Sequence, residues 1–145
     1  MSRAALLLAL LVVVACTKKD EPAADTTAAI APGMNVAGKW TVRVMPDDRD
    51  TTLLVYSLEA TNTNTGWRIT LPDREPMDVR VVHIDSDSIV VENGPYSSAL
   101  QPGVMVTTHS NVRLEGDKLV GRTIAGYQTT GADSLRVFRT EGVRQ

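Results

Sequence analysis

Cysteine, histidine and aromatic residues are scarce in this sequence. Its 145 residues include one cysteine, Cys16, two histidines and only 4% aromatic residues. A single cysteine excludes a disulfide within the chain. The apolar run from Ala4 to Val14 is shorter than the roughly 20 residues that a membrane-spanning helix requires. The charges are mixed and sum to −2, so the chain offers no basic surface for nucleic acid.

The motifs of several enzyme classes are missing as well. The sequence has no Gly-x-Ser-x-Gly nucleophile elbow, no phosphate-binding Walker loop and no dinucleotide fingerprint. His83 and His109 fall in different expected strands without a matched carboxylate, which makes a poor metal site. The segment Asp47 to Asp50 has oxygen ligands for calcium but lacks the spacing of a known calcium loop. We therefore expect no enzyme activity, no metal and no cofactor; a catalytic site would need polar residues that only the fold could assemble.

The first fifteen residues have the pattern of a secretion signal. A positive charge at Arg3 precedes the short apolar run, and the small residue Ala15 stands at its exit. The exit, Val13-Val14-Ala15-Cys16, resembles the bacterial lipobox, in which an aliphatic, a tolerant and a small position precede a cysteine. The resemblance implies that the Cys16 thiol receives a diacylglyceryl group and that cleavage falls just before it. An ordinary signal peptide with an incidental cysteine is the alternative, although a free thiol in an exported protein is a liability.

Residues 16–35 are expected to form a lipid-anchored, flexible spacer. They are rich in Ala, Thr, Pro and charge, and they have no hydrophobic periodicity, so they cannot bury enough apolar surface to fold. About 19 residues of such chain span roughly 25 Å. Two or three acyl chains hold a protein firmly to a membrane. In enterobacterial lipoproteins an aspartate after the cysteine favours the inner membrane; Thr17 stands there instead, which implies the periplasmic face of the outer membrane in the cell envelope.

Residues 36–145 are predicted to form one all-β domain, large enough for a core without disulfides. Val, Thr and Ile abound, turn signals recur about every eight to twelve residues, and no long stretch has helical periodicity. The alternation of Trp40, Val42 and Val44 indicates a strand with one buried face. Eight strands are predicted, over residues 38–44, 51–60, 67–71, 79–84, 88–92, 104–114, 118–127 and 134–140. An antiparallel meander of eight strands can close into a barrel, and a two-sheet sandwich is the alternative.

The strand pattern resembles the lipocalin and calycin barrels. Their hallmark near the start is Gly-x-Trp on the first strand, which here is Gly38-Lys39-Trp40. The resemblance implies that Trp40 closes one end of the barrel and that an arginine of the last strand, Arg136 or Arg139, packs on it. A guanidinium over an indole is a favourable contact. The Thr-Asp-Tyr stretch and the C-terminal helix of lipocalins are missing, and an ordinary core tryptophan is the alternative reading of Trp40.

The segment Asn93 to Gly103 is predicted to be a long loop. Loops of this length in a compact domain often carry function. We expect Tyr96 and Leu100 to cover the mouth of the barrel, although the segment can also be a packed connection. The candidate ligand-binding residues are Tyr56, Trp67, Tyr96, Leu100, Val106 and Tyr127.

Two functions are compatible with such a domain. The first is binding of a small apolar ligand or a lipid inside the barrel; the scarcity of aromatic residues counts against it, because eight strands can fill their own interior. The second is an envelope protein-interaction or inhibitor module that acts through its loops on an unknown partner. It predicts a filled interior and an exposed apolar patch near Tyr96 to Pro102.

Overall fold

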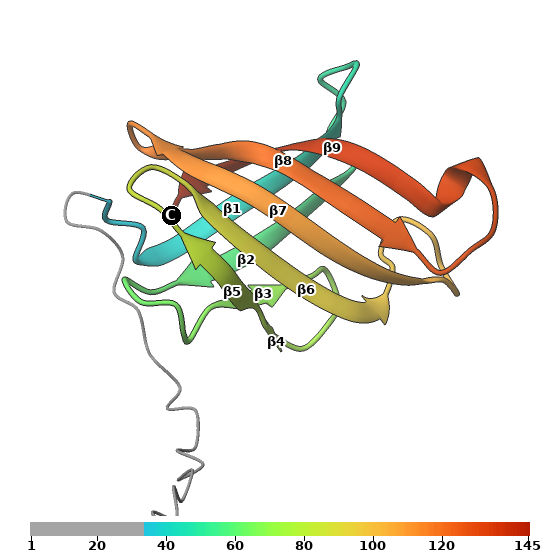
Figure 1. Cartoon of the computed structure of the whole chain (residues 1–145), viewed down its shortest axis with the longest axis horizontal. Helices are drawn as coiled ribbons and strands as arrows, with labels where there is room; N and C mark the ends of the chain where they lie inside the picture. The colour runs from blue at the N-terminus through green and yellow to red at the C-terminus, as the bar shows by residue number, and fades with distance from the viewer. Residues whose placement is uncertain (1–33) are drawn as a thin grey trace, which may run out of the picture.

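The computed structural model describes residues 34–145, which form one antiparallel sheet rolled into a nearly closed barrel (Figure 1). The signal, Cys16 and most of the spacer lie outside the described residues. No helix in this part of the chain has the length and apolar character needed to cross a membrane. The elements are β1 (Gly38–Pro46), β2 (Leu54–Ala60), β3 (Arg68–Thr70), β4 (Met77–Asp78), β5 (Arg80–Ile84), β6 (Ile89–Ser97), β7 (Met105–Glu115), β8 (Lys118–Tyr127), the 3₁₀ helix η1 (Ala132–Ser134) and β9 (Leu135–Arg144).

Pairing between the first and last strands rolls the sheet up. The strand order is β4-β3-β2-β1-β9-β8-β7-β6-β5, and Val44 of β1 is paired with Thr140 of β9. The two sheet edges, β4 and β5, are consecutive in the chain and are separated only by Val79, whose N–H donates to the Trp67 carbonyl at 2.9 Å. All strands thus belong to a single sheet. The expected all-β barrel is confirmed, and the two-sheet sandwich does not apply.

The described residues contain nine strands rather than the expected eight. The additional one is the two-residue β4, which pairs with β3, while β5 pairs with β6. Val79 separates them because its backbone turns toward Trp67 and its side chain is buried in the core. The segment from Met77 to Ile84 therefore passes from one edge of the sheet, as β4, to the other edge, as β5.

Alternation along the strands divides interior from exterior, as the sequence predicts. In β1 the side chains of Trp40, Val42 and Val44 are buried. In β7 the buried Val106, Ser110 and Val112 alternate with residues that face the solvent or are only half-buried. Because successive side chains of a strand point to opposite faces, each strand gives one row of residues to the barrel interior.

One end of the barrel is closed by both tryptophans of the chain; we call it the tryptophan end. Trp40 and Trp67 are almost fully buried, and their indole N–H groups donate to the carbonyls of Val36 at 2.9 Å and Thr63 at 2.8 Å. Met34 is also buried in this core cluster, so residues of the expected spacer already belong to the fold. The described chain begins and ends at this end of the barrel (Figure 1).

The arginine that covers Trp40 is Arg144, not Arg136 or Arg139. Its guanidinium lies 4.2 Å from the centre of the Trp40 ring, and it donates to the Ala37 and Asn35 carbonyls. The prediction placed the end of the last strand at Thr140, whereas β9 continues to Arg144, which pairs directly with Trp40. Arg136 instead bonds Asp133 of η1, and Arg139 bonds Asp50.

The first half of the predicted loop from Asn93 to Gly103 belongs to strand β6. β6 continues through Ser97, with Tyr96 opposite Val106 of β7, and a register shift between Asn93 and Tyr96 accommodates Gly94 and Pro95. Gly94 has φ +121, and a Cβ there would lie 2.6 Å from the Val106 carbonyl oxygen. A bulge of this kind is one place where a sheet tolerates Gly-Pro. The actual connection, residues 98–104, is called the mouth loop below.

Candidate ligand-binding site in the barrel

The end of the barrel opposite the tryptophans contains a cavity of about 60 Å³, which we call the mouth cavity. All three tyrosines of the chain line it, from three different strands: Tyr56 of β2, Tyr96 of β6 and Tyr127 of β8. Ser98 and Leu100 of the mouth loop also line this cavity. The remaining lining residues are apolar or carry hydroxyls: Val44, Leu54, Ile69, Leu71, Ala99, Val106, Thr108, Ser110, Thr123, Ala125 and Phe138.

The surroundings of the three tyrosines favour their neutral form. Burial raises the pKa of Tyr56 above its ordinary value, and the neighbouring Tyr96 phenol raises it further. Burial also raises the pKa of Tyr96 and of Tyr127, against smaller opposing effects of hydrogen bonds with Thr108 and Ser98. Arg74 near Tyr96 and Arg136 near Tyr127 lower these pKa values to a smaller extent, but the lost hydration of a phenolate outweighs them, so the folded state retains these protons.

This retention predicts that the barrel loses stability in strong base through Tyr56. In the unfolded chain Tyr56 ionises near pH 10.0, whereas the folded chain holds the proton to higher pH. Above about pH 10 the unfolded state therefore binds fewer protons, and the free energy of unfolding falls as pH rises. Denaturant titrations at a series of pH values are expected to show this fall in the parent protein and a shallower one in Tyr56→Phe. Identical pH profiles for the two proteins would contradict the prediction.

A second cavity, of about 40 Å³, lies deeper in the barrel toward the tryptophan end and is called the inner cavity. It shares four lining residues with the mouth cavity: Tyr56, Ile69, Thr108 and Ser110. Its other walls are largely apolar and include Trp67, Leu58 and Val91. The polar exceptions are Asn93 of β6, which is 8% exposed, and Thr140 of β9. The two cavities therefore adjoin each other along the barrel axis.

Three hydroxyl groups form a line across the interior wall between the cavities. Ser110 of β7 lies 2.7 Å from Thr123 of β8, and Thr123 lies 2.7 Å from Thr140 of β9, measured between side-chain oxygens. All three residues are buried. Ser110 and Thr123 meet because they are direct cross-strand partners in β7 and β8. Thr140 of β9 is the partner of Gly121, which is the inward-facing residue of β8 next to Thr123, so Thr140 lies diagonally across from Thr123.

The mouth loop is held in place by its own backbone and by an arginine from a neighbouring connection. The Ser98 N–H donates to the Val104 carbonyl at 2.8 Å, and the Ser98 hydroxyl accepts from the N–H groups of Leu100 and Gln101. Arg74, between β3 and β4, donates to the carbonyls of Ser97 and Ser98. This arrangement keeps Leu100 packed against the cluster of apolar residues at the mouth.

The structure brings the sequence-predicted candidates together. Tyr56, Tyr96, Leu100, Val106 and Tyr127 all line the mouth cavity, and Trp67 lines the inner cavity. Sequence reasoning missed Asn93, which was assigned to a loop. Its signal was the alternation of Ile89, Val91 and Asn93, which extends the inward face of β6 by one more residue.

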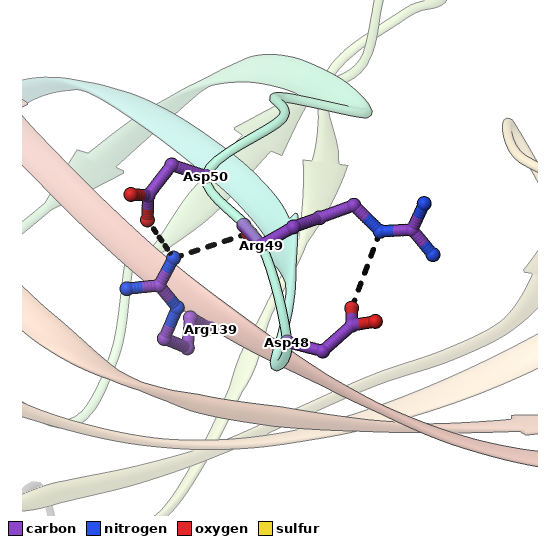
Figure 2. Close-up of polar contacts among 4 residues, drawn as sticks. All are labelled: Asp48, Arg49, Asp50 and Arg139. Carbon is purple, nitrogen blue, oxygen red and sulfur yellow. Dashed lines mark hydrogen bonds and ion pairs between the residues drawn. The ribbon is translucent and has the colours of Figure 1, made fainter.

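The acidic segment at Asp47 to Asp50 forms part of the β1–β2 connection, where arginines neutralise its carboxylates. Figure 2 shows Arg139 of β9 between the Asp50 carboxylate and the Arg49 carbonyl, with Arg49 paired to Asp48 at 3.2 Å. Asp47 is 3.2 Å from Arg122. Within residues 34–145, no three His, Cys, Asp or Glu side chains are grouped so that they could hold a metal ion. The segment therefore acts as an ion-paired hairpin loop.

The two histidines do not meet. His83 of β5 pairs with Asp85 at 3.0 Å, and His109 of β7 lies 3.4 Å from Glu92. Both side chains are more than half exposed on the outer face of the barrel. They therefore take no part in the cavities.

Comparison of the chain with protein-family models, with curated proteins and with solved structures finds no match. The geometry of the barrel interior is therefore the observation that bears on function.

Proposed function

We propose that this protein is a lipid-anchored binding protein of the cell envelope whose barrel holds a small ligand in the mouth and inner cavities. The observation that carries the proposal is the pair of adjoining cavities that share Tyr56, Ile69, Thr108 and Ser110. Interiors of proteins are close-packed, so two neighbouring voids lined mostly by apolar side chains indicate a place for another molecule.

The size of the cavities selects a small molecule rather than a lipid. An apolar cavity of roughly 150 Å³ holds one benzene molecule, which has six non-hydrogen atoms. Taken together, the two cavities of about 60 and 40 Å³ accept about four or five such atoms on that scale. An acyl chain would not fit unless the barrel opened. At a ceiling of about 1.5 kcal/mol per atom, such a ligand binds no more tightly than roughly micromolar.

The chemistry of the lining supports binding rather than catalysis. No Asp, Glu, His, Lys, Arg or Cys is among the lining residues of either cavity. General acid–base catalysis usually depends on such groups with pKa values near the working pH. The tyrosines present here retain their protons, so they can donate hydrogen bonds but are poor bases.

The outer surface gives less support to a protein-interaction module. Among the large exposed apolar side chains of residues 34–145, Leu135 and Val137 lie on β9 and Ile124 of β8 is the cross-strand partner of Val137, whereas Val55 and Val82 lie apart on β2 and β5. Tyr96 and Leu100 are packed against the cavity and do not form an exposed apolar patch at the mouth loop. A group of three such side chains on β8 and β9 is of a size that is ordinary on the surface of a monomer.

We expect acyl chains on Cys16 to anchor the barrel to a membrane, at the periplasmic face of the outer membrane. The support for this expectation is the lipobox-like Val13-Val14-Ala15-Cys16 and the apolar run before it.

A fragment titration of the full chain tests the binding proposal. The ¹⁵N-labelled protein, purified in detergent, would be titrated with neutral molecules of up to about six non-hydrogen atoms while amide resonances are recorded. We expect saturable shifts at cavity residues such as Val106 and Ala125.

The variant Ala125→Leu fills the mouth cavity and should lose these shifts. Ile124→Leu, on the solvent face of the same strand, is the matched control and should retain them. If no molecule shifts the cavity resonances of the parent protein, the proposal is wrong.

A further inference from the structure

Asn93 has buried hydrogen-bond donors without an acceptor. Its side chain is 8% exposed and lines the inner cavity, and its Nδ2 atom has no hydrogen-bond partner among the described residues. The amide nitrogen carries two N–H groups. Buried polar groups are almost always paired, because an unpaired donor loses its hydration and gains nothing in return. The inner cavity is the space in which an acceptor for Asn93 would lie.

The line of hydroxyls adds another donor at the same place. Ser110, Thr123 and Thr140 carry three O–H groups, and the two contacts between them use only two of the three protons. No other hydrogen bond joins these hydroxyls to the described residues, so one proton is left over whichever way the line is oriented. Ser110 and Thr140 both line the inner cavity. In the two orientations that run along the line in one direction, the leftover donor is Ser110 or Thr140 and is available to a molecule in that cavity; if both outer hydroxyls donate to Thr123, the leftover donor is Thr123, which lines the mouth cavity.

The ligand should also be uncharged. Neither cavity is lined by a charged side chain that could pair with an ion, and an unpaired buried charge is strongly unfavourable. The raised pKa values of the three tyrosines report the same property of the cavity, since it disfavours their phenolate forms.

We propose that the barrel selects a neutral molecule of about four or five non-hydrogen atoms that presents one hydrogen-bond acceptor oxygen to Asn93 Nδ2 and the hydroxyl line. The apolar part of the molecule lies against Ile69 and Tyr56, which both cavities share. A ketone, an aldehyde or a small amide has this chemistry. This inference rests on the proposed function and specifies its ligand class.

Three probes of nearly the same shape test it: 2-butanone, 2-methyl-1-butene and propanoate. The first carries an acceptor, the second replaces the carbonyl oxygen by a carbon, and the third is an anion. Each is titrated into the ¹⁵N-labelled full chain in detergent, with free probe measured in the aqueous phase. We expect 2-butanone to bind about fivefold to tenfold more tightly than the alkene, which is the usual effect of one hydrogen bond. Propanoate should not bind.

The side-chain amide of Asn93 supplies a direct signal, because its own resonances should move with 2-butanone and stay in place with the alkene. In Asn93→Leu the preference for the ketone should disappear while the alkene still binds. Asn111→Leu, the same substitution at an exposed site on β7, should keep the preference.

Equal affinities for ketone and alkene in the parent protein, or an unmoved Asn93 amide, would overturn the assignment of the ligand class and leave the binding function intact. If none of the three probes shifts any cavity resonance, the assignment of the ligand class fails, and the fragment titration described above decides whether the proposed function fails with it.

Discussion

Replacing Cys16 with serine is expected to abolish acylation of the chain completely. Attachment of the diacylglyceryl group to a lipobox cysteine requires a sulfur nucleophile. A thiol with a pKa near 8.5 supplies some thiolate at neutral pH, whereas a serine hydroxyl does not ionise there. The parent protein should incorporate radiolabelled palmitate and have the mass of a chain that begins at an acylated Cys16. Cys16→Ser should incorporate none and keep its first fifteen residues.

The conservative substitution Thr17→Ser is the matched control for this experiment. It changes the neighbouring residue and leaves the lipobox-like sequence Val13 to Cys16 as it is, so the label should be retained. Label in Cys16→Ser would show that acylation takes place at another residue. An unlabelled parent protein cleaved elsewhere would show that an ordinary signal peptide is present and that Cys16 is incidental.

A single methyl group at Gly121 is expected to destabilise the barrel by about 3 kcal/mol or more, the upper part of the range for overpacking. A Cβ at this position of β8 would lie 2.0 Å from the Asn111 carbonyl oxygen and 2.8 Å from the Val112 Cα. Ordinary carbon contacts are about 3.5–4.0 Å. The atoms in conflict belong to the backbone of β7, so relief requires the β7–β8 ladder to move.

The neighbouring Gly126 in the same strand provides the control. A Cβ there would meet only the Thr107 carbonyl oxygen, at 3.7 Å, which is an ordinary contact. Gly126→Ala should therefore be neutral or slightly stabilising, because alanine restricts the unfolded chain. In a thermal melt Gly121→Ala should lower the Tm by on the order of 12 °C, and Gly126→Ala should change it little. Equal melting temperatures for the two variants would refute the close approach at Gly121.

The alternation of side chains explains why much of the barrel could be predicted. Trp40, Val42 and Val44 showed the inward face of β1, and turn signals separated the strands of the meander. The candidates converge because each occupies an inward position at the mouth end of the barrel, near the start of β2 and β7 and near the finish of β6 and β8: Tyr56, Tyr96, Val106 and Tyr127. Inward position follows from period-two patterning, which is a local property of the sequence.

The features that escaped prediction depend on cross-strand register or on bulges. Arg144 faces Trp40 because β9 runs further than its turn signals indicate. Ser110, Thr123 and Thr140 form a line because three strands are aligned by their connections, and one strand alone does not show this. Asn93 was hidden because the following Gly-Pro is typical of a loop, whereas here a bulge lets β6 continue past it.

The aromatic residues of this chain are sorted by type between the two ends of the barrel. Both tryptophans are buried at the tryptophan end, and all three tyrosines line the mouth cavity. The molecule thus carries two kinds of intrinsic optical reporter, which adjoin each other at the inner cavity, where Tyr56 and Trp67 both contribute to the wall. Near-ultraviolet bands of tyrosine should respond to events at the mouth, while tryptophan fluorescence should report on the closed end. A ligand at the mouth should change the tyrosine bands, whereas a ligand in the inner cavity should also change the fluorescence of Trp67, so the depth of entry can be followed in the unlabelled protein.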